Sequence, residues 1–81
     1  MTAKFIPQNL SILAKAEAFN SWVYRVMVPS DLGAVLAPGF FNPAYGDDMY
    51  LGDMIVISGL GFGLIRFIGF ENRNVVLTMP I

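Results

Sequence analysis

Three carboxylates lie close together in the chain, and their type and spacing come nearest to those of a reactive site. Asp47 and Asp48 are adjacent, and Asp53 follows five residues later. Paired carboxylates can bind a hard cation or divide the roles of general acid and general base. The intervening Met49-Tyr50-Leu51 is apolar, however, whereas calcium loops supply oxygen ligands at short intervals. We therefore interpret Asp53, which follows Gly52, as a turn residue whose carboxylate accepts backbone N–H bonds.

A second candidate is the glycine pattern Gly59-x-Gly61-x-Gly63. A loop that binds phosphate leads directly into a helix, because the first turn of the helix supplies the aligned N–H groups. Here a strand pattern follows, with apolar and β-branched residues from Leu64 to Phe70. The pattern therefore predicts a turn between two hairpin strands.

The remaining chemistry is limited by what the chain lacks. It has no histidine and no cysteine, which removes disulfides, thiolate chemistry, Cys/His zinc sites and every imidazole-based triad. No base is present to activate the serines, which are Ser11, Ser21, Ser30 and Ser58. We expect no catalytic, cofactor-binding or metal-binding residues and no enzymatic activity.

The elements that position these residues are predicted to be mainly strands. Trp22 to Val28 is rich in β-branched and aromatic residues, with Trp22, Tyr24 and Val26 on one face and Val23, Arg25 and Met27 on the other. A three-stranded meander is expected further on, from segments Asp53–Ser58, Leu64–Phe70 and Val75–Met79. The run Met54-Ile55-Val56-Ile57 indicates a strand buried on both faces.

The other segments are shorter or ambiguous. Ser30 or Asp31 is expected to cap a short helix that runs to Ala37 and stops at Pro38-Gly39. Residues 40–50 read as a loop, in which Asp47 and Asp48 could begin a short helical turn. Leu10 to Phe19 fits either a short helix or a strand, and Asn20-Ser21 reads as a turn.

These patterns predict a mainly β fold in a small single domain, either an antiparallel β-sandwich or a barrel-like meander with one short helix. Residues 1–20 are expected to form an N-terminal arm or segment, and residues 21–81 the β-domain.

The composition predicts that this domain associates with something. Hydrophobic residues make up 56% of the 81 residues and charged residues 14%, whereas an ordinary soluble domain has about 25% charged residues. A chain this small cannot bury so much apolar side chain by itself, so the excess is expected at interfaces. No uncharged stretch reaches the roughly 20 apolar residues of a membrane span, and we expect a soluble, non-secreted protein that does not bind a membrane.

The charges argue against nucleic acid as the partner. The formal net charge is −1, with five basic and six acidic residues. The sequence has no cluster of Lys and Arg residues that would bind a phosphate backbone. The aromatic residues Phe40, Phe41, Tyr45 and Tyr50, with Trp22, are either a contact surface or simply core, and the sequence leaves these alternatives open.

From Trp22 to the C-terminus, the chain resembles a family of small structural proteins of tailed bacteriophages. The resemblance rests on an aromatic strand, a helix start, an aromatic loop, and a turn that leads into a strand. The matching segments are Trp22-Val23-Tyr24-Arg25, Pro29-Ser30-Asp31, Gly39-Phe40-Phe41-Asn42 and Tyr50-Leu51-Gly52-Asp53-Met54-Ile55. The match covers about 60 of the 81 residues and consists of turn and hydrophobic patterns. Phe replaces the Tyr of the family's Gly-Tyr-Phe-Asn loop.

The resemblance implies a capsid cement or decoration protein, or the base of a head fibre, although the long extra domain of a fibre is missing. It further implies a homo-oligomer, commonly a trimer, bound to the major capsid protein on the virion surface and made in the host cytoplasm. The expected contact residues are Phe5, Ile6, Phe40, Phe41, Tyr45, Met49 and Tyr50. The alternative is a monomeric small β-barrel module that binds a peptide or a glycan.

Overall fold

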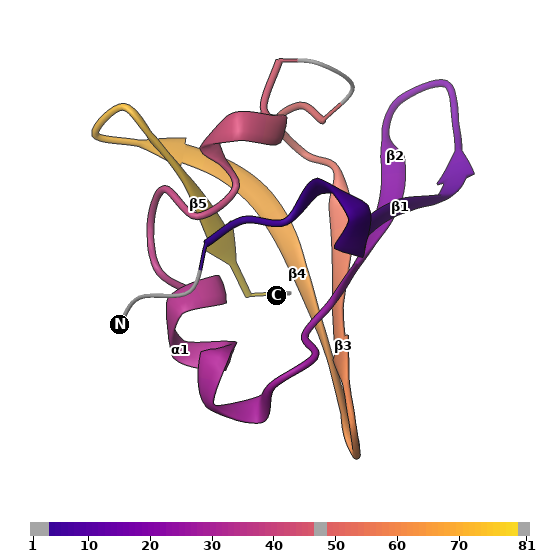
Figure 1. The fold of residues 1–81 in the computed structure, drawn as a ribbon. Helices are drawn as coiled ribbons and strands as arrows, with labels where there is room; N and C mark the ends of the chain where they lie inside the picture. The colour runs from indigo at the N-terminus through magenta and orange to yellow at the C-terminus, as the bar shows by residue number, and fades with distance from the viewer. Residues whose placement is uncertain (1–3, 47–48, 80–81) are drawn as a thin grey trace.

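The computed structural model describes residues 4–46 and 49–79 and places five strands and four short helical segments among them (Figure 1). The strands are β1 (Leu10–Lys15), β2 (Asn20–Arg25), β3 (Met54–Gly59), β4 (Phe62–Glu71) and β5 (Asn74–Thr78). The α-helix is α1 (Leu32–Val35), and the 3₁₀ segments are η1 (Pro7–Asn9), η2 (Pro29–Asp31) and η3 (Asn42–Ala44). A mainly β domain with one short α-helix is confirmed.

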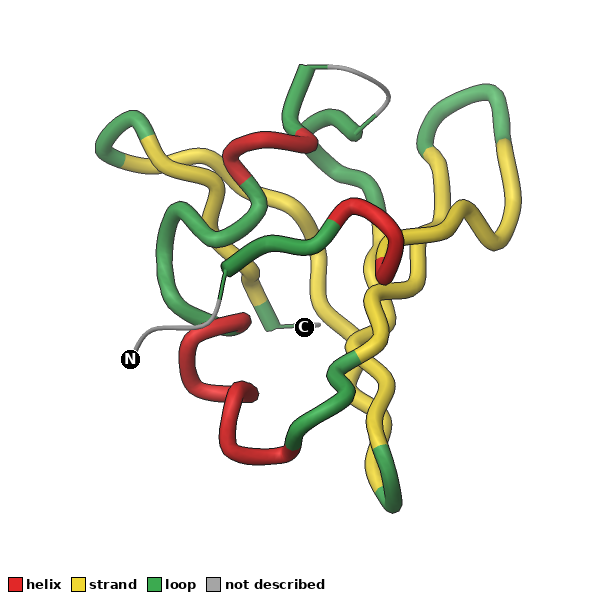
Figure 2. Tube along the Cα trace, viewed as in Figure 1, coloured by secondary structure: helices red, strands yellow, loops and turns green. Residues whose placement is uncertain are grey.

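All five strands belong to one mixed sheet in the order β1-β2-β3-β4-β5. The predicted meander of β3, β4 and β5 is confirmed, with antiparallel pairing at both contacts. The pair β2–β3 is parallel, because residues 26–53 form a crossover that returns the chain to the same end of the sheet. Figure 2 shows this crossover, with its helical segments in red, lying within the curve of the yellow strands.

The ambiguous segment after the N-terminus is a strand. β1 pairs antiparallel with β2 and carries a bulge between Ile12 and Ala14. Asn20 and Ser21 begin β2 instead of forming the predicted turn, which lies at residues 16–19. Residues 10–15 therefore belong to the same sheet as the other four strands.

The core lies on one side of the sheet and follows the alternation of side chains. Trp22, Tyr24 and Val26 are buried, which confirms the face predicted for β2. Their neighbours on β3 are Ile55 and Ile57, which are fully buried. The core on this side also contains Val35 of α1, Phe41 and Met49 of the segment between α1 and β3, Ile68 of β4, and Val75 of β5.

The crossover contains a short helix close to the predicted place. Pro29 opens η2 with its fixed φ, and α1 follows and ends at Val35, two residues before the expected end. Asp31 occupies the N-cap position, but its side chain makes no capping hydrogen bond.

The free edge of β5 is occupied by the loop that follows the helix. Gly39 donates its N–H to the Val75 carbonyl at 2.8 Å, and Val75 N–H donates to Asn42 Oδ1 at 2.8 Å. Asn42 Nδ2 also donates to Asn74 Oδ1 at 3.0 Å. Gly39 has φ +89°, and a Cβ there would lie 3.0 Å from Asn74 Oδ1, so the tight approach requires glycine.

Replacing Asn42 by alanine is expected to lower the free energy of unfolding by about 1 to 2 kcal/mol, because the Val75 N–H loses its acceptor. Chemical denaturation measures the change. Asn42→Asp keeps an acceptor for Val75 and loses only the donor to Asn74, so it should cost less. Equal losses in the two variants would contradict this account of the edge.

Candidate functional site

The carboxylate cluster does not form a reactive site around Asp53. Asp47 and Asp48 lie outside the described residues. Asp53 is buried, with 3% of its surface exposed. Its Oδ1 accepts the N–H of Asn20 at 3.0 Å, and its Oδ2 accepts Trp22 Nε1–H at 3.0 Å and the N–H of Tyr50 at 3.1 Å.

Asp53 therefore joins three parts of the fold: the β1–β2 hairpin, the core and the loop before β3. Its backbone adds to this role, since the Tyr50 carbonyl accepts Asp53 N–H at 3.1 Å and the Asp53 carbonyl accepts Ile68 N–H at 2.8 Å. The interpretation of Asp53 as a turn residue that accepts backbone N–H bonds is confirmed. The bond from Trp22 was not foreseen, because nothing local in the sequence brings that indole to residue 53.

The glycine pattern is a turn, as predicted. β3 ends at Gly59 and β4 begins at Phe62, so residues 60–61 connect two antiparallel strands. Gly61 has φ +81°, in the left-handed region that favours glycine. Within residues 4–46 and 49–79, no three Asp, Glu, His or Cys side chains gather in a way that could hold a metal ion.

The predicted contact residues divide between the core and the surface. Phe41 and Met49 are buried, with 1% and 0% of their surfaces exposed, so they are core residues of the chain itself. Phe5 and Phe40 are half-buried and join Phe41 and Tyr24 in a cluster whose ring centroids lie 5.1–6.0 Å apart.

Three predicted contact residues lie farther out. Tyr45 is half-buried and stacks on Phe70, with ring centroids 5.1 Å apart. Ile6 and Tyr50 are exposed. Some of the predicted contact residues are therefore core and others surface. Of the seven, only Ile6 and Tyr50 are exposed, at 46% and 52%.

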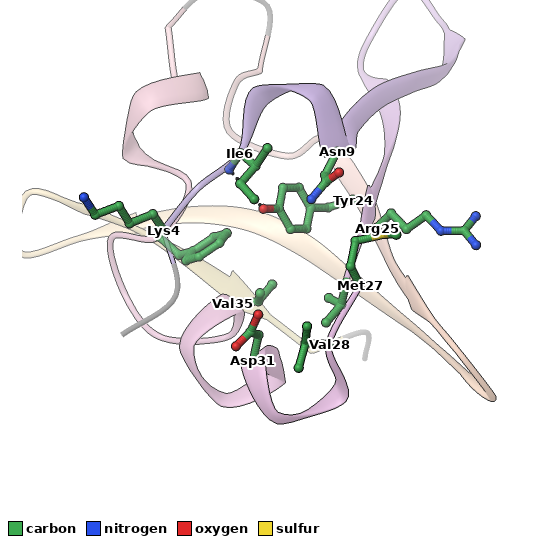
Figure 3. Close-up of a pocket in the computed structure, with 11 residues that line it drawn as sticks. Lys4, Ile6, Asn9, Tyr24, Arg25, Met27, Val28, Asp31 and Val35 are labelled. Atoms are coloured by element: carbon green, nitrogen blue, oxygen red, sulfur yellow. Dashed lines mark hydrogen bonds between the residues drawn. The ribbon is translucent and has the colours of Figure 1, made fainter. Parts of the chain in front are cut away.

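A pocket of about 130 Å³ lies between the N-terminal segment and the start of the crossover (Figure 3). Tyr24 lines it, and its hydroxyl accepts the N–H of Ile6 at 3.1 Å. The charged ends of Lys4 and Arg25 extend away from it in opposite directions. Pockets for small organic ligands usually measure roughly 300–1,000 Å³, so this one suits at most a single side chain.

A further candidate contact surface is the side of the sheet that faces away from the core. We call it the outer face and define it by six apolar residues that alternate with core residues: Val23, Met54, Val56, Ile65, Phe67 and Val76. None of the six belongs to the core cluster or packs against it. Five are half-buried by their neighbours, and Ile65 is 47% exposed.

The residues of the outer face lie in rows across the strands. Val23 pairs with Val56, and Val56 pairs with Ile65. In the next row Met54 pairs with Phe67. Exposing an apolar sheet face to water costs free energy. Because the outer face is apolar as well as the core face, it is well suited to bind a partner.

The sequence pattern indicated part of the outer face. The run from Met54 to Ile57 predicted a strand buried on both faces, and one of those faces is the core. The other is the outer face, where the described residues place no second layer. The alternation in β4, where Ile65 and Phe67 interleave with Leu64, Arg66 and Ile68, would have extended the same signal to a second strand.

No family model, curated protein or solved structure matches this chain. In the described part of the chain, none of the helices has the length and apolar character needed to cross a bilayer.

Proposed function

We propose that this chain is a non-enzymatic structural protein of a tailed-bacteriophage virion, a capsid cement or decoration protein that works by burying apolar surface. The observation that carries the proposal is the outer face, whose six apolar residues lie on four adjacent strands and are left uncovered by the described residues. Burial of apolar surface stabilises an assembly by roughly 25 cal/mol per Å², and no catalytic group is needed for it.

The virion assignment is supported by the resemblance of residues 22–81 to small phage structural proteins. The matched segments have structural roles that fit a scaffold. Gly39 and Asn42 close the β5 edge, and Asp53 ties the loop, hairpin and core together. Contact with the major capsid protein is predicted at the exposed residues Ile6 and Tyr50. The resemblance also implies that copies of the chain associate on the capsid.

The observations give less support to a monomeric module for a peptide or glycan. Such a module needs a groove with convergent polar groups. The described pocket is small, and its charged neighbours Lys4 and Arg25 extend away from it.

Co-sedimentation of the purified chain with phage heads assembled from a tailed-phage major capsid protein tests the proposal. Wild-type protein should co-sediment and raise the temperature at which the heads disrupt. Ile65→Lys puts a charge on the outer face and should weaken binding by about tenfold or more. Leu60→Lys is the matched control, because Leu60 is exposed in the β3–β4 turn away from the outer face. A wild-type chain that stays monomeric at micromolar concentration and does not bind heads contradicts the proposal.

A further inference from the structure

We infer that the partner of the outer face is a second copy of this chain, packed face to face across a two-fold axis with Arg25 of each copy against Glu71 of the other. This inference rests on the assembly role proposed above for the outer face, and it names the partner.

A sheet gains partners either along its edges or on its faces, and part of each edge of this sheet is already occupied. On β5, the Val75 N–H and C=O are already bonded to Asn42 and Gly39. On β1, the Leu10 N–H donates to the Pro7 carbonyl, and the strand carries a bulge between Ile12 and Ala14. Bulges, short edge strands and edge lysines such as Lys15 are the usual means by which proteins prevent edge-to-edge pairing. The outer face is therefore the route by which the sheet binds a partner.

The outer face has the properties of one half of a β-sandwich. Val23, Val56 and Ile65 occupy directly neighbouring positions on three strands. Two sheets that pack face to face interdigitate side chains of this kind across about 10 Å. A second copy would thus supply the other sheet of a sandwich that the single chain does not form.

The charges of the outer face lie at its two ends. Alternation along β2 places Arg25 on the same side as Val23, and alternation along β4 places Glu71 on the same side as Ile65. Arg25 pairs with Ser58, which pairs with Gly63, and Glu71 is eight residues farther along β4, about 26 Å away. Arg25 and Glu71 therefore cannot meet within one chain.

A two-fold axis that crosses the strands obliquely beside Met54 and Phe67, four residues from the Arg25 end and four from the Glu71 end, exchanges these two ends. It brings Arg25 of one copy over Glu71 of the other, and it does so twice because a two-fold contact is self-complementary. Figure 3 shows the Arg25 guanidinium extending away from the core side, where a partner could reach it. This complementarity between the two ends of one surface selects a second copy over an unrelated partner.

Sedimentation equilibrium of the full chain tests the pairing by a charge exchange. Wild-type protein should form dimers of twice its 8.9 kDa mass. Arg25→Glu and Glu71→Arg should each weaken dimerisation by roughly tenfold at low salt, because each places like charges together twice. The double variant should return to near the wild-type dissociation constant. Circular dichroism checks that each variant is folded, which is expected because both residues are exposed.

Three results would overturn the inference: a monomer, a trimer, or a double variant no tighter than the single variants. Failure of the inference can be told apart from failure of the proposed function. If the wild-type chain is a monomer that binds heads, and the Ile65→Lys variant does not bind them, the capsid covers the outer face. A dimer that does not bind heads would leave the inference intact and remove the capsid role.

Discussion

Replacing Asp53 by alanine is expected to lower the free energy of unfolding by about 3 kcal/mol or more, since each lost buried hydrogen-bond partner costs about 1–3 kcal/mol. Three N–H groups lose this acceptor, and the indole Nε1–H of Trp22 is the most buried of them. For a domain of this size the loss corresponds to a fall in melting temperature of about 12 to 24 °C. Thermal and urea unfolding measure it.

The control for this prediction is Asp31→Ala. Asp31 also stands next to a helical segment, but its side chain makes no capping hydrogen bond, so the change should stay within about 0.5 kcal/mol. Trp22→Phe removes one of the three donors and should give a loss smaller than that of Asp53→Ala. Similar stability of the Asp53→Ala and Asp31→Ala proteins would show that the carboxylate does not join the hairpin, core and loop as described.

The second large effect is expected from Phe41→Ala, which should cost about 3–5 kcal/mol, as truncations of buried aromatic residues usually do. Phe41 is 1% exposed, and its ring lies 5.1 Å from those of Tyr24 and Phe40 and 5.7 Å from that of Phe5, measured between centroids. The cavity would open at the centre of this cluster. Urea denaturation of the purified variant measures the loss.

The same substitution at Phe19 provides the comparison. Phe19 is 43% exposed beside the turn between β1 and β2, so Phe19→Ala should change stability far less. The pair also separates the two interpretations of the aromatic loop. If Phe41→Ala left stability unchanged and abolished association, Phe41 would be a contact residue, contrary to its burial.

Much of the sheet follows from local pattern. Trp22, Tyr24 and Val26 alternate with less buried residues because strand side chains point to opposite faces, and the sequence shows this directly. The β4–β5 turn is similarly local, since Asn72 and Arg73 have φ of 51° and 66° between two strand patterns. Asp53 was recognised as an acceptor because Gly-Asp is common in turns.

What the sequence left open depends on contacts between distant residues. Leu10 to Phe19 contains good helix formers, and pairing with β2 is what makes residues 10–15 a strand. Phe41 and Met49 lie on a loop, and loops are usually exposed. Phe41 and Met49 are buried because the crossover folds back over Tyr24 and Ile57. No local sequence pattern indicates this arrangement. The parallel contact between β2 and β3 is hidden for the same reason.

The crossover at residues 26–53 also determines when this domain can fold during synthesis. The β1–β2 hairpin is made first, but the strand that lies beside it begins only at Met54. Until Ile55 and Ile57 have left the ribosome, Trp22 and Tyr24 have only β1 beside them and lack their partners on β3. Parallel contacts across a long crossover form slowly. The nascent chain therefore carries the β1–β2 hairpin without β3 until Met54–Gly59 has emerged, and the core is complete only when Ile68 and Val75 have also emerged.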